Sequence, residues 1–266
     1  MTAPAPRRDL RVRDLRVQIG DRRILDGVSL DVPSGERLGV IGASGSGKSM
    51  LALALLGLTP SGAEVRGSIR LGATELVGQP DRERARSRGS GLGIVFQEPG
   101  TALDPLRRVG AQIVEPLRRS GASRTDARAG AIRLAASVGL PEPGRLLRQY
   151  PHQLSGGQRQ RICIAIALAG DPDVIVADEP TTALDVTTQA RILERFQTAT
   201  AERGQGLLFV THDLAVLAQV ADTAVVLDRG QVVETGPVTR LLTAPQHRAT
   251  AALVEAARAT ARMVRT

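Results

Sequence analysis

The segment GASGSGKS, Gly42–Ser49, constrains the fold of this chain more than any other feature of its sequence. It follows a short apolar run at 37–42 and precedes SMLALALLGL at 49–58, which has the composition of a helix. The segment matches the pattern G-x-x-x-x-G-K-[ST] in the strand–turn–helix setting that makes this pattern specific. Glycines let successive backbone N–H groups curl around phosphate oxygens, and the helix dipole adds a favourable field. We therefore expect a phosphate-binding turn, called the phosphate loop below.

Each residue type in the phosphate loop suits a particular part of a nucleotide. Lys48, the only lysine in the sequence, is placed to reach the β- and γ-phosphates, and the Ser49 hydroxyl to hold Mg²⁺. The backbone around the phosphates comes from Gly42, Ala43, Ser44, Gly45, Ser46 and Gly47. The alternative interpretation is a glycine-rich turn with a structural role only.

Apolar runs typical of buried strands alternate with helix-like segments along much of the chain. Strand-like runs lie at 91–97, 173–180 and 206–213, and a helix-like segment lies at 190–203. Fully apolar strands that alternate with helices are typical of a mainly parallel sheet covered on both faces. The core is therefore expected to have a three-layer α/β fold.

Three other segments depart from this alternation. Residues 65–76 have the alternation of an antiparallel strand pair, and 224–236 predicts a hairpin that turns at Asp228–Gly230. From about 98 to 160, helix-like stretches are broken by Pro and Gly, which indicates a helical subdomain inserted into the α/β core.

Four polar residues lie at the ends of the strand-like runs. Asp178 and Glu179 end one run, Gln97 ends a second and His212 ends a third. Ligands of such sheets bind beyond the carboxyl ends of the strands, so these side chains are expected beside the phosphate loop. There Asp178 would face the metal, Glu179 an attacking water, and the other two a water or a phosphate. The alternatives are a cap for Asp178, a solvated charge for Glu179 and a structural role for His212.

The segment LSGGQ, Leu154–Gln158, is a second candidate for a helix N-terminus that binds phosphate. It is called the signature segment below. Ser155 can cap a helix that begins near Gln158, and Gly156 and Gly157 can present bare N–H groups to a γ-phosphate.

Composition excludes several classes of protein. The longest apolar runs are far shorter than the roughly 20 residues that span a bilayer, and the first ten residues contain no secretion signal. A single cysteine excludes an internal disulfide and fits the cytoplasm. The net charge of +8 comes from scattered arginines with only 2% aromatic residues, so nucleic acid is not an expected partner.

With this set of motifs the chain resembles the nucleotide-binding subunits of ABC transporters. The resemblance rests on the phosphate loop, Gln97, the signature segment, the acids at 178–179, the ALD at Ala183–Asp185 and His212. It implies a P-loop NTPase (RecA-like) core with an antiparallel β-subdomain and the inserted helical subdomain. It places the ABC ATPase domain at 8–245 and a short C-terminal helical extension at 246–266.

The resemblance also implies roles for individual residues. ATP would be held by the phosphate loop, and Mg²⁺ by Ser49, Gln97 and Asp178. Glu179 would polarise water, while Gln97 and His212 would sense the γ-phosphate and touch ATP. The signature residues Ser155, Gly156, Gly157 and Gln158, together with Asp185, would act on the ATP of a partner subunit. Ile19 stands where the family stacks an aromatic residue on adenine, and we expect weaker ATP affinity or looser base selectivity as a result.

Longer segments are similar to importers of oligopeptides, dipeptides and nickel. They are FQEPGTALDPLRRVGAQIVEPL, YPHQLSGGQRQR, ADEPTTALDVTTQARIL and LLTAPQHRATAALVEAA. Many peptide importers carry a cysteine-rich motif for an iron–sulfur cluster, which a chain with only Cys163 lacks, and this favours nickel or metal-chelate importers.

The resemblance to importers implies several partners. They are two membrane permeases, a second ATPase forming a heterodimer rather than a homodimer, and an extracytoplasmic substrate-binding protein. The chain would work at the cytoplasmic face of the membrane and touch it only through the permeases. The alternatives are a soluble ABC ATPase acting on nucleic acid or a protein complex, and a regulatory ATP-binding module without turnover.

Overall fold

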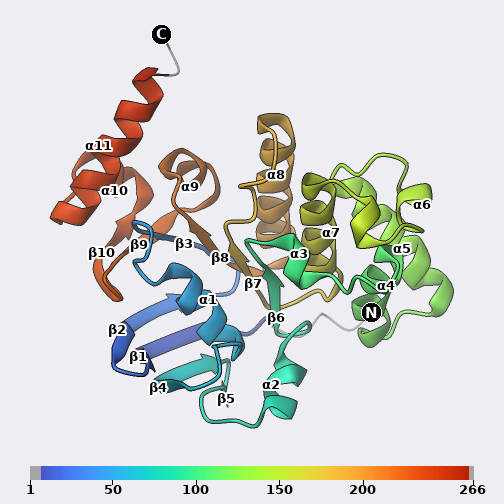
Figure 1. Ribbon diagram of the computed structural model, residues 1–266, viewed down its shortest axis with the longest axis horizontal. Coiled ribbons are helices and arrows are strands. Elements are labelled where there is room, and N and C mark those ends of the chain that lie inside the picture. The colour runs from blue at the N-terminus through green and yellow to red at the C-terminus, as the bar shows by residue number, and fades with distance from the viewer. Residues whose placement is uncertain (1–6, 264–266) are drawn as a thin grey trace.

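The computed structural model describes residues 7–263 and contains two sheets (Figure 1). The antiparallel sheet has the strand order β2-β1-β4-β5. Its strands are β1 Leu10–Ile19, β2 Arg22–Val32, β4 Ala63–Leu71 and β5 Thr74–Glu75. The alternating pattern predicted at 65–76 corresponds to the β4–β5 pair.

The second sheet has six strands in the order β10-β9-β3-β8-β7-β6. They are β3 Arg37–Ile41, β6 Leu92–Val95, β7 Val174–Asp178, β8 Gly206–Thr211, β9 Thr223–Asp228 and β10 Gln231–Pro237. All neighbours in this sheet are parallel except β9 and β10, which form the predicted hairpin. Every residue of β7 and β8 is buried, which explains their uninterrupted apolar runs.

Helices account for most of the remaining chain. They are α1 Lys48–Leu56, α2 Asp81–Ser87, α3 Pro99–Ala102, α4 Val109–Arg119, α5 Arg124–Ser137, α6 Pro143–Leu146, the 3₁₀ helix η1 Pro151–Gln153, α7 Gly156–Ala169, α8 Val186–Arg203, α9 Leu214–Val220, α10 Val238–Thr243 and α11 Arg248–Met263. Figure 1 shows α3 to α7 gathered at one side of the molecule and α11 at the other. Among the described residues, no helix is both long and apolar enough to span a membrane.

The side chains of the parallel sheet divide between two hydrophobic cores. Val174, Val176 and Leu208 pack with α1 and the antiparallel sheet on one face. Ile175 and Phe209 pack with helices α4, α5 and α7 to α11 on the other. Strand residues alternate between faces, so each strand contributes to both cores. The predicted three-layer arrangement is confirmed, with an antiparallel sheet forming much of one outer layer.

Two predicted boundaries differ from the structure. Strand β6 ends at Val95, so Gln97 lies in the following loop and does not end a strand. Helix α7 begins at Gly156, earlier than expected, because Ser155 itself adopts the N-cap conformation. The predicted C-terminal extension contains α11, and its residues 264–266 lie outside the described part of the chain.

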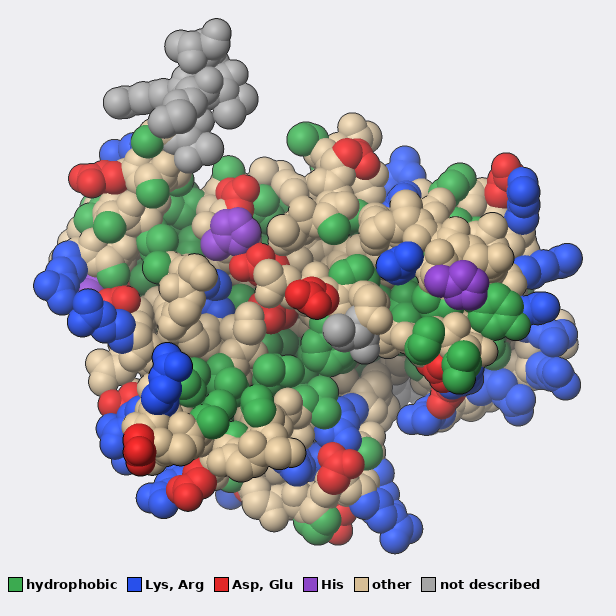
Figure 2. All heavy atoms as spheres, in the orientation of Figure 1, with side chains coloured by type: hydrophobic (Ala, Val, Ile, Leu, Met, Phe, Trp, Pro, Cys, Tyr) green, Lys and Arg blue, Asp and Glu red, His purple; other side chains and the backbone are tan. Residues whose placement is uncertain are grey.

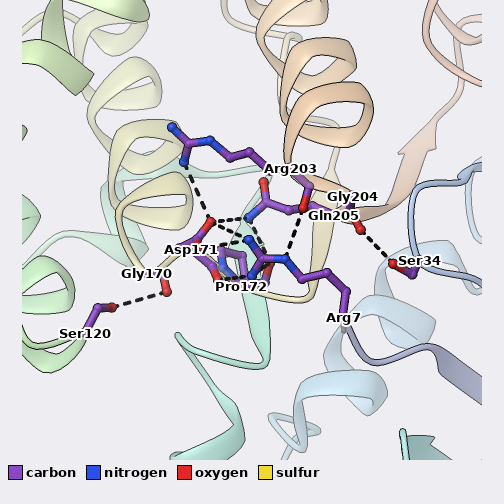
Figure 3. Close-up of polar contacts among 9 residues, drawn as sticks. All are labelled: Arg7, Ser34, Ser120, Gly170, Asp171, Pro172, Arg203, Gly204 and Gln205. Atoms are coloured by element: carbon purple, nitrogen blue, oxygen red, sulfur yellow. Dashed lines mark hydrogen bonds and ion pairs between the residues drawn. The ribbon is translucent and has the colours of Figure 1, made fainter. Parts of the chain in front are cut away.

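A polar cluster joins three segments at the amino ends of β7 and β8 (Figure 3). Both carboxylate oxygens of Asp171 accept hydrogen bonds of 2.9 Å from Arg7. The Gln205 amide donates to the Asp171 carboxylate at 3.2 Å and to the Pro172 carbonyl at 2.8 Å. Arg7 also donates to the Arg203 carbonyl at 3.1 Å. We call these five residues the amino-edge cluster.

Candidate functional site

The phosphate loop connects β3 to α1, as the sequence predicts. Gly47 is the N-cap of α1 with φ 107°, in the left-handed region that side chains rarely adopt. At Gly42, an added Cβ would collide with the backbone carbonyl of Leu227 in β9. Both positions therefore require glycine, one because of its conformation and the other because of a neighbouring strand.

The Lys48 side chain folds back over the phosphate loop. Its ammonium donates to the carbonyls of Gly42 and Ala43 at 2.8 and 3.0 Å, and the residue is only 7% exposed. Burial lowers the pKa of Lys48, and the nearby carboxylates of Glu179 and Asp178 act in the opposite direction. A cation held in this way gains favourable interaction from any phosphate that reaches the loop.

Asp178 ends β7 and lies beside the first helical turn after the phosphate loop. It is 6% exposed, and the Ser49 side chain lies near its carboxylate. Burial raises the pKa of Asp178, and the Glu179 carboxylate raises it further. One carboxylate oxygen, Oδ1, is buried and has no hydrogen-bond partner among the described residues.

These oxygen donors suit a hard divalent cation. A carboxylate with an unpaired buried oxygen, next to a hydroxyl, is the donor set that Mg²⁺ uses together with phosphate oxygens and water. The described residues contain no group of three or more His, Cys, Asp or Glu side chains that could hold a metal alone.

Glu179 lies at the centre of a cluster formed at the carboxyl ends of β6, β7 and β8. Its carboxylate accepts from the Gln97 amide at 3.3 Å and from the Thr182 hydroxyl at 3.2 Å. On the other oxygen, His212 Nδ1 lies at 2.9 Å. The three strands are neighbours in the parallel sheet, so their ends deliver these side chains to one place. We call these four residues the carboxyl-edge cluster.

The backbone also sets the position of Glu179. Its φ of 45° lies in the left-handed region, which is uncommon for a residue with a side chain, and its N–H donates to the Val210 carbonyl at 2.9 Å. The Thr182 contact was not expected from the sequence, because a threonine four residues after a strand end has no distinctive pattern. The two other histidines, His152 and His247, lie outside this cluster.

The signature segment forms the start of α7. Ser155 and Gln158 make a capping box: the serine hydroxyl accepts from the Gln158 N–H at 3.3 Å, and the Gln158 side chain accepts from the Ser155 N–H at 3.0 Å. An added Cβ would meet nothing within 4 Å at Gly156, whereas at Gly157 it would lie 3.4 Å from the Ala183 carbonyl. The signature segment therefore borders the 183–185 turn of its own chain.

The remaining predicted residues lie in other elements. Asp185 caps α8, accepting from the Thr188 N–H at 2.9 Å. Ile19 ends β1 and pairs with Arg22 and Ala63 within the antiparallel sheet. The structure thus brings the phosphate loop, Asp178 and the carboxyl-edge cluster together, while the signature segment belongs to the helical region and Ile19 to the other sheet.

The parallel sheet, the phosphate loop and the acids at its carboxyl edge define the class of P-loop NTPases. Within this class, a family model described as ABC transporter matches residues 25–182, and the chain belongs to that family. The resemblance found in the sequence motifs is thereby confirmed, as is the predicted fold class.

Curated relatives match most of the chain. The oligopeptide transport ATP-binding protein OppD of Mycobacterium bovis is 48% identical over 217 residues, covering 81% of this chain and 36% of OppD. OppD of Lactococcus lactis subsp. cremoris is 46% identical over 229 residues, covering 85% and 68%. The glutathione import ATP-binding protein GsiA of Salmonella paratyphi A is 47% identical over 237 residues, covering 86% and 38%. The chain spans little more than a third of two of these relatives.

A solved structure with the same fold is the dimeric post-hydrolysis state of the ATP-binding cassette MJ0796 bound to ADP and Pi. It matches with a TM-score of 0.77 at 29% identity, covering 86% of this chain and 98% of that one.

Proposed function

We propose that the chain is the ATP-binding and ATP-hydrolysing subunit of an ABC importer for peptides. The observation that carries the proposal is the carboxyl-edge cluster, in which Gln97 and His212 hold the Glu179 carboxylate beside the Asp178 site. The names of the relatives, which specify oligopeptide and glutathione import, favour peptides as the substrate class over nickel or a metal chelate.

ATP would bind at the phosphate loop. The backbone N–H groups of 42–49 would surround its phosphates, and Lys48 would exchange its two carbonyl contacts for phosphate oxygens. Ser49, Asp178 and Gln97 would hold Mg²⁺, which neutralises charge that develops on the phosphates when it is bound. We further propose that Ile19 packs against adenine without the stacking that an aromatic ring provides.

Hydrolysis requires positioning of a water molecule more than covalent chemistry. The Glu179 side chain is only 12% exposed and is fixed from both sides, so its carboxylate is suited to accept a proton from water. His212 and Gln97 would keep that carboxylate directed at the γ-phosphate. This assignment argues against a regulatory module without turnover.

A second ATPase subunit would complete the site. The exposed N-terminus of α7, with Gly156 facing open space, suits the γ-phosphate of an ATP held by another chain. Ser155, Gly157, Gln158 and Asp185 would contribute to the same contact. The dimeric MJ0796 cassette supports pairing in general, and we propose that the partner here is a different polypeptide.

Permease subunits would dock on the helical region. A groove of about 1000 Å³ between α4, α5 and α6 is lined in part by apolar side chains, which include Val114 and Leu147. Its arginines include Arg107, Arg108, Arg118, Arg124, Arg128 and Arg148. Figure 2 shows basic side chains gathered over this region. Acidic loops of the two membrane permeases would fit this groove. Docking there would place the chain at the cytoplasmic face of the membrane. An extracytoplasmic protein would supply the substrate.

The test of this function is ATP hydrolysis by the purified chain and its Glu179→Gln variant. The variant keeps one oxygen that can accept from Gln97 and Thr182 but loses the base, so we expect ATP binding within about twofold of wild type and a turnover about 10²–10⁴-fold lower. Equal turnover in both proteins would exclude Glu179 as the base. Stimulation by nucleic acid, rather than co-purification with permeases, would favour a soluble ATPase.

A further inference from the structure

A buried amide in helix α7 connects two loops that lie far apart in the sequence. Gln160 is 1% exposed. Its Nε2 donates to the carbonyl of Phe96 at 3.3 Å and to the carbonyl of Pro180 at 3.0 Å. Because both partners are acceptors, the amide has only one orientation that satisfies them, with the nitrogen towards the loops.

The two carbonyls belong to residues next to the carboxyl-edge cluster. Phe96 immediately precedes Gln97, and Pro180 immediately follows Glu179. The side chains of Gln97 and Glu179 are themselves joined at 3.3 Å. Gln160 therefore ties together the backbone on which two of the four cluster side chains depend, through hydrogen bonds to main-chain carbonyls.

A second contact from the same helix face supports this arrangement. Cys163, one turn beyond Gln160, donates its thiol to the carbonyl of Pro99 at 3.8 Å. Burial raises the pKa of Cys163 to about 12, so the group remains a neutral thiol and a donor. Two successive positions on one face of α7 thus hold the loop that carries Gln97.

The signature segment lies at the N-terminus of α7, the helix that carries Gln160. Ser155, the N-cap of α7, lies five residues before Gln160, and the helix between them is continuous. A shift or rotation of α7 at its N-terminus would therefore move the amide that holds both loops. Misplacing reacting groups by about 1 Å costs on the order of 100-fold in rate, so small movements are sufficient.

We propose that Gln160 is a positioning residue that couples the signature segment to Gln97 and Glu179 of the same chain. The proposal rests on the proposed function, in which the signature segment contacts the ATP of a partner subunit. Through Gln160, occupancy of the partner's ATP site sets the position of the hydrolytic groups in this one. The two ATP sites of a dimer then hydrolyse cooperatively.

The chain contains a matched control for this residue. Gln205 is also fully buried and donates from Nε2 to two acceptors. In the part of the chain that the structure describes, neither its Oε1 nor that of Gln160 has a hydrogen-bond partner. It belongs to the amino-edge cluster, at the other end of the same strands (Figure 3). Loss of either amide removes comparable hydrogen bonds, but only Gln160 lies beside the hydrolytic groups.

The experiment compares Gln160→Met with Gln205→Met in the full chain assembled with its partner subunits. Methionine approximates the length of glutamine without its polar atoms. We expect both variants to lose a similar amount of thermal stability. Gln160→Met alone should lower kcat about 10- to 100-fold, keep the KM for ATP within about twofold, and lower the Hill coefficient for ATP towards 1. Unchanged kcat in Gln160→Met, or an equal loss in Gln205→Met, would overturn the proposal.

A second variant, Gln160→Glu, tests the proposal through the pH dependence of kcat. A purely structural role for Gln160 would not change this dependence. In Gln160→Glu an ionised carboxylate would face two carbonyl oxygens, whereas the protonated acid can still donate to one of them. Its kcat relative to wild type should therefore rise as the pH falls from 8 to 6, and a ratio independent of pH would contradict the proposal. If wild type itself does not hydrolyse ATP, the proposed function fails, and an active wild type with unaffected Gln160 variants rejects the coupling alone.

Discussion

The two edges of the parallel sheet hold similar side chains in opposite electrostatic conditions. At the amino edge, Asp171 accepts two hydrogen bonds from Arg7 and one from Gln205. At the carboxyl edge, Asp178 is more deeply buried, and within residues 7–263 one of its oxygens has no hydrogen-bond partner. The same strands thus place one acid where its charge is matched within the chain and another where it is not.

This difference between the two edges indicates that the amino edge contributes to stability and the carboxyl edge to function. Paired and hydrogen-bonded acids stabilise a fold, whereas burial has raised the pKa of Asp178 and lowered that of Lys48, so both charged forms are disfavoured. A nucleotide with its metal would supply the opposite charges that these groups lack. We therefore expect substitutions at the carboxyl edge to lower activity with little loss of stability. Substitutions at the amino edge are expected to lower stability with little loss of activity.

The largest effect is expected from Asp178→Asn. It removes a carboxylate proposed to hold Mg²⁺, and we expect ATP hydrolysis to fall by about 10³-fold. Because the folded-state pKa of Asp178 is raised, its ionised form destabilises the fold above that pKa, and the penalty is relieved as the pH falls. The variant should therefore unfold about 2–4 °C higher than wild type near neutral pH, a gain of about 1 kcal/mol. A lower melting temperature, measured by calorimetry across pH, would contradict this comparison.

A smaller effect is expected from Thr182→Val within the carboxyl-edge cluster. The Thr182 hydroxyl donates to the Glu179 carboxylate at 3.2 Å, and valine has the same shape without the donor. The loss of one hydrogen bond, worth about 1 kcal/mol, should lower kcat about fivefold with little change in melting temperature. Thr182→Ser keeps the hydroxyl and should retain wild-type turnover; equal losses in both variants would rule out a role for this hydrogen bond.

The smallest effect is expected from Arg7→Ala at the amino edge. Asp171 is half exposed, so solvent screens the pair and the loss of stability should be about 1 kcal/mol, without a change in turnover. Arg11 serves as the control, since its side chain is largely exposed and its ion pair with Asp9 is 3.3 Å long. Arg11→Ala should leave the denaturation midpoint unchanged. A drop in turnover in Arg7→Ala would show that the two edges are not independent.

Much of the carboxyl edge could be predicted from local sequence. The apolar runs before Asp178 and His212 specify buried parallel strands, and parallel strands deliver their last residues to one edge. The position of Gln97 in a loop could not be predicted, because its strand stops two residues earlier where no Gly or Pro marks an end. The contact between Arg7 and Asp171 joins residues 164 positions apart, and no local pattern specifies such a pair. The same holds for Gln160, whose two partners lie 64 and 20 positions away.

The burial of Cys163 has a practical consequence for measuring motion. It is the only cysteine, it is 4% exposed, and at pH 8 a thiol of this pKa is ionised in only about one molecule in ten thousand. Maleimide and methanethiosulfonate reagents act on the accessible thiolate, so they should leave the native chain unlabelled. A single cysteine introduced at an exposed position of α7 and another on the α/β core would therefore carry the only probes, and the distance between them would report the movement of α7 directly.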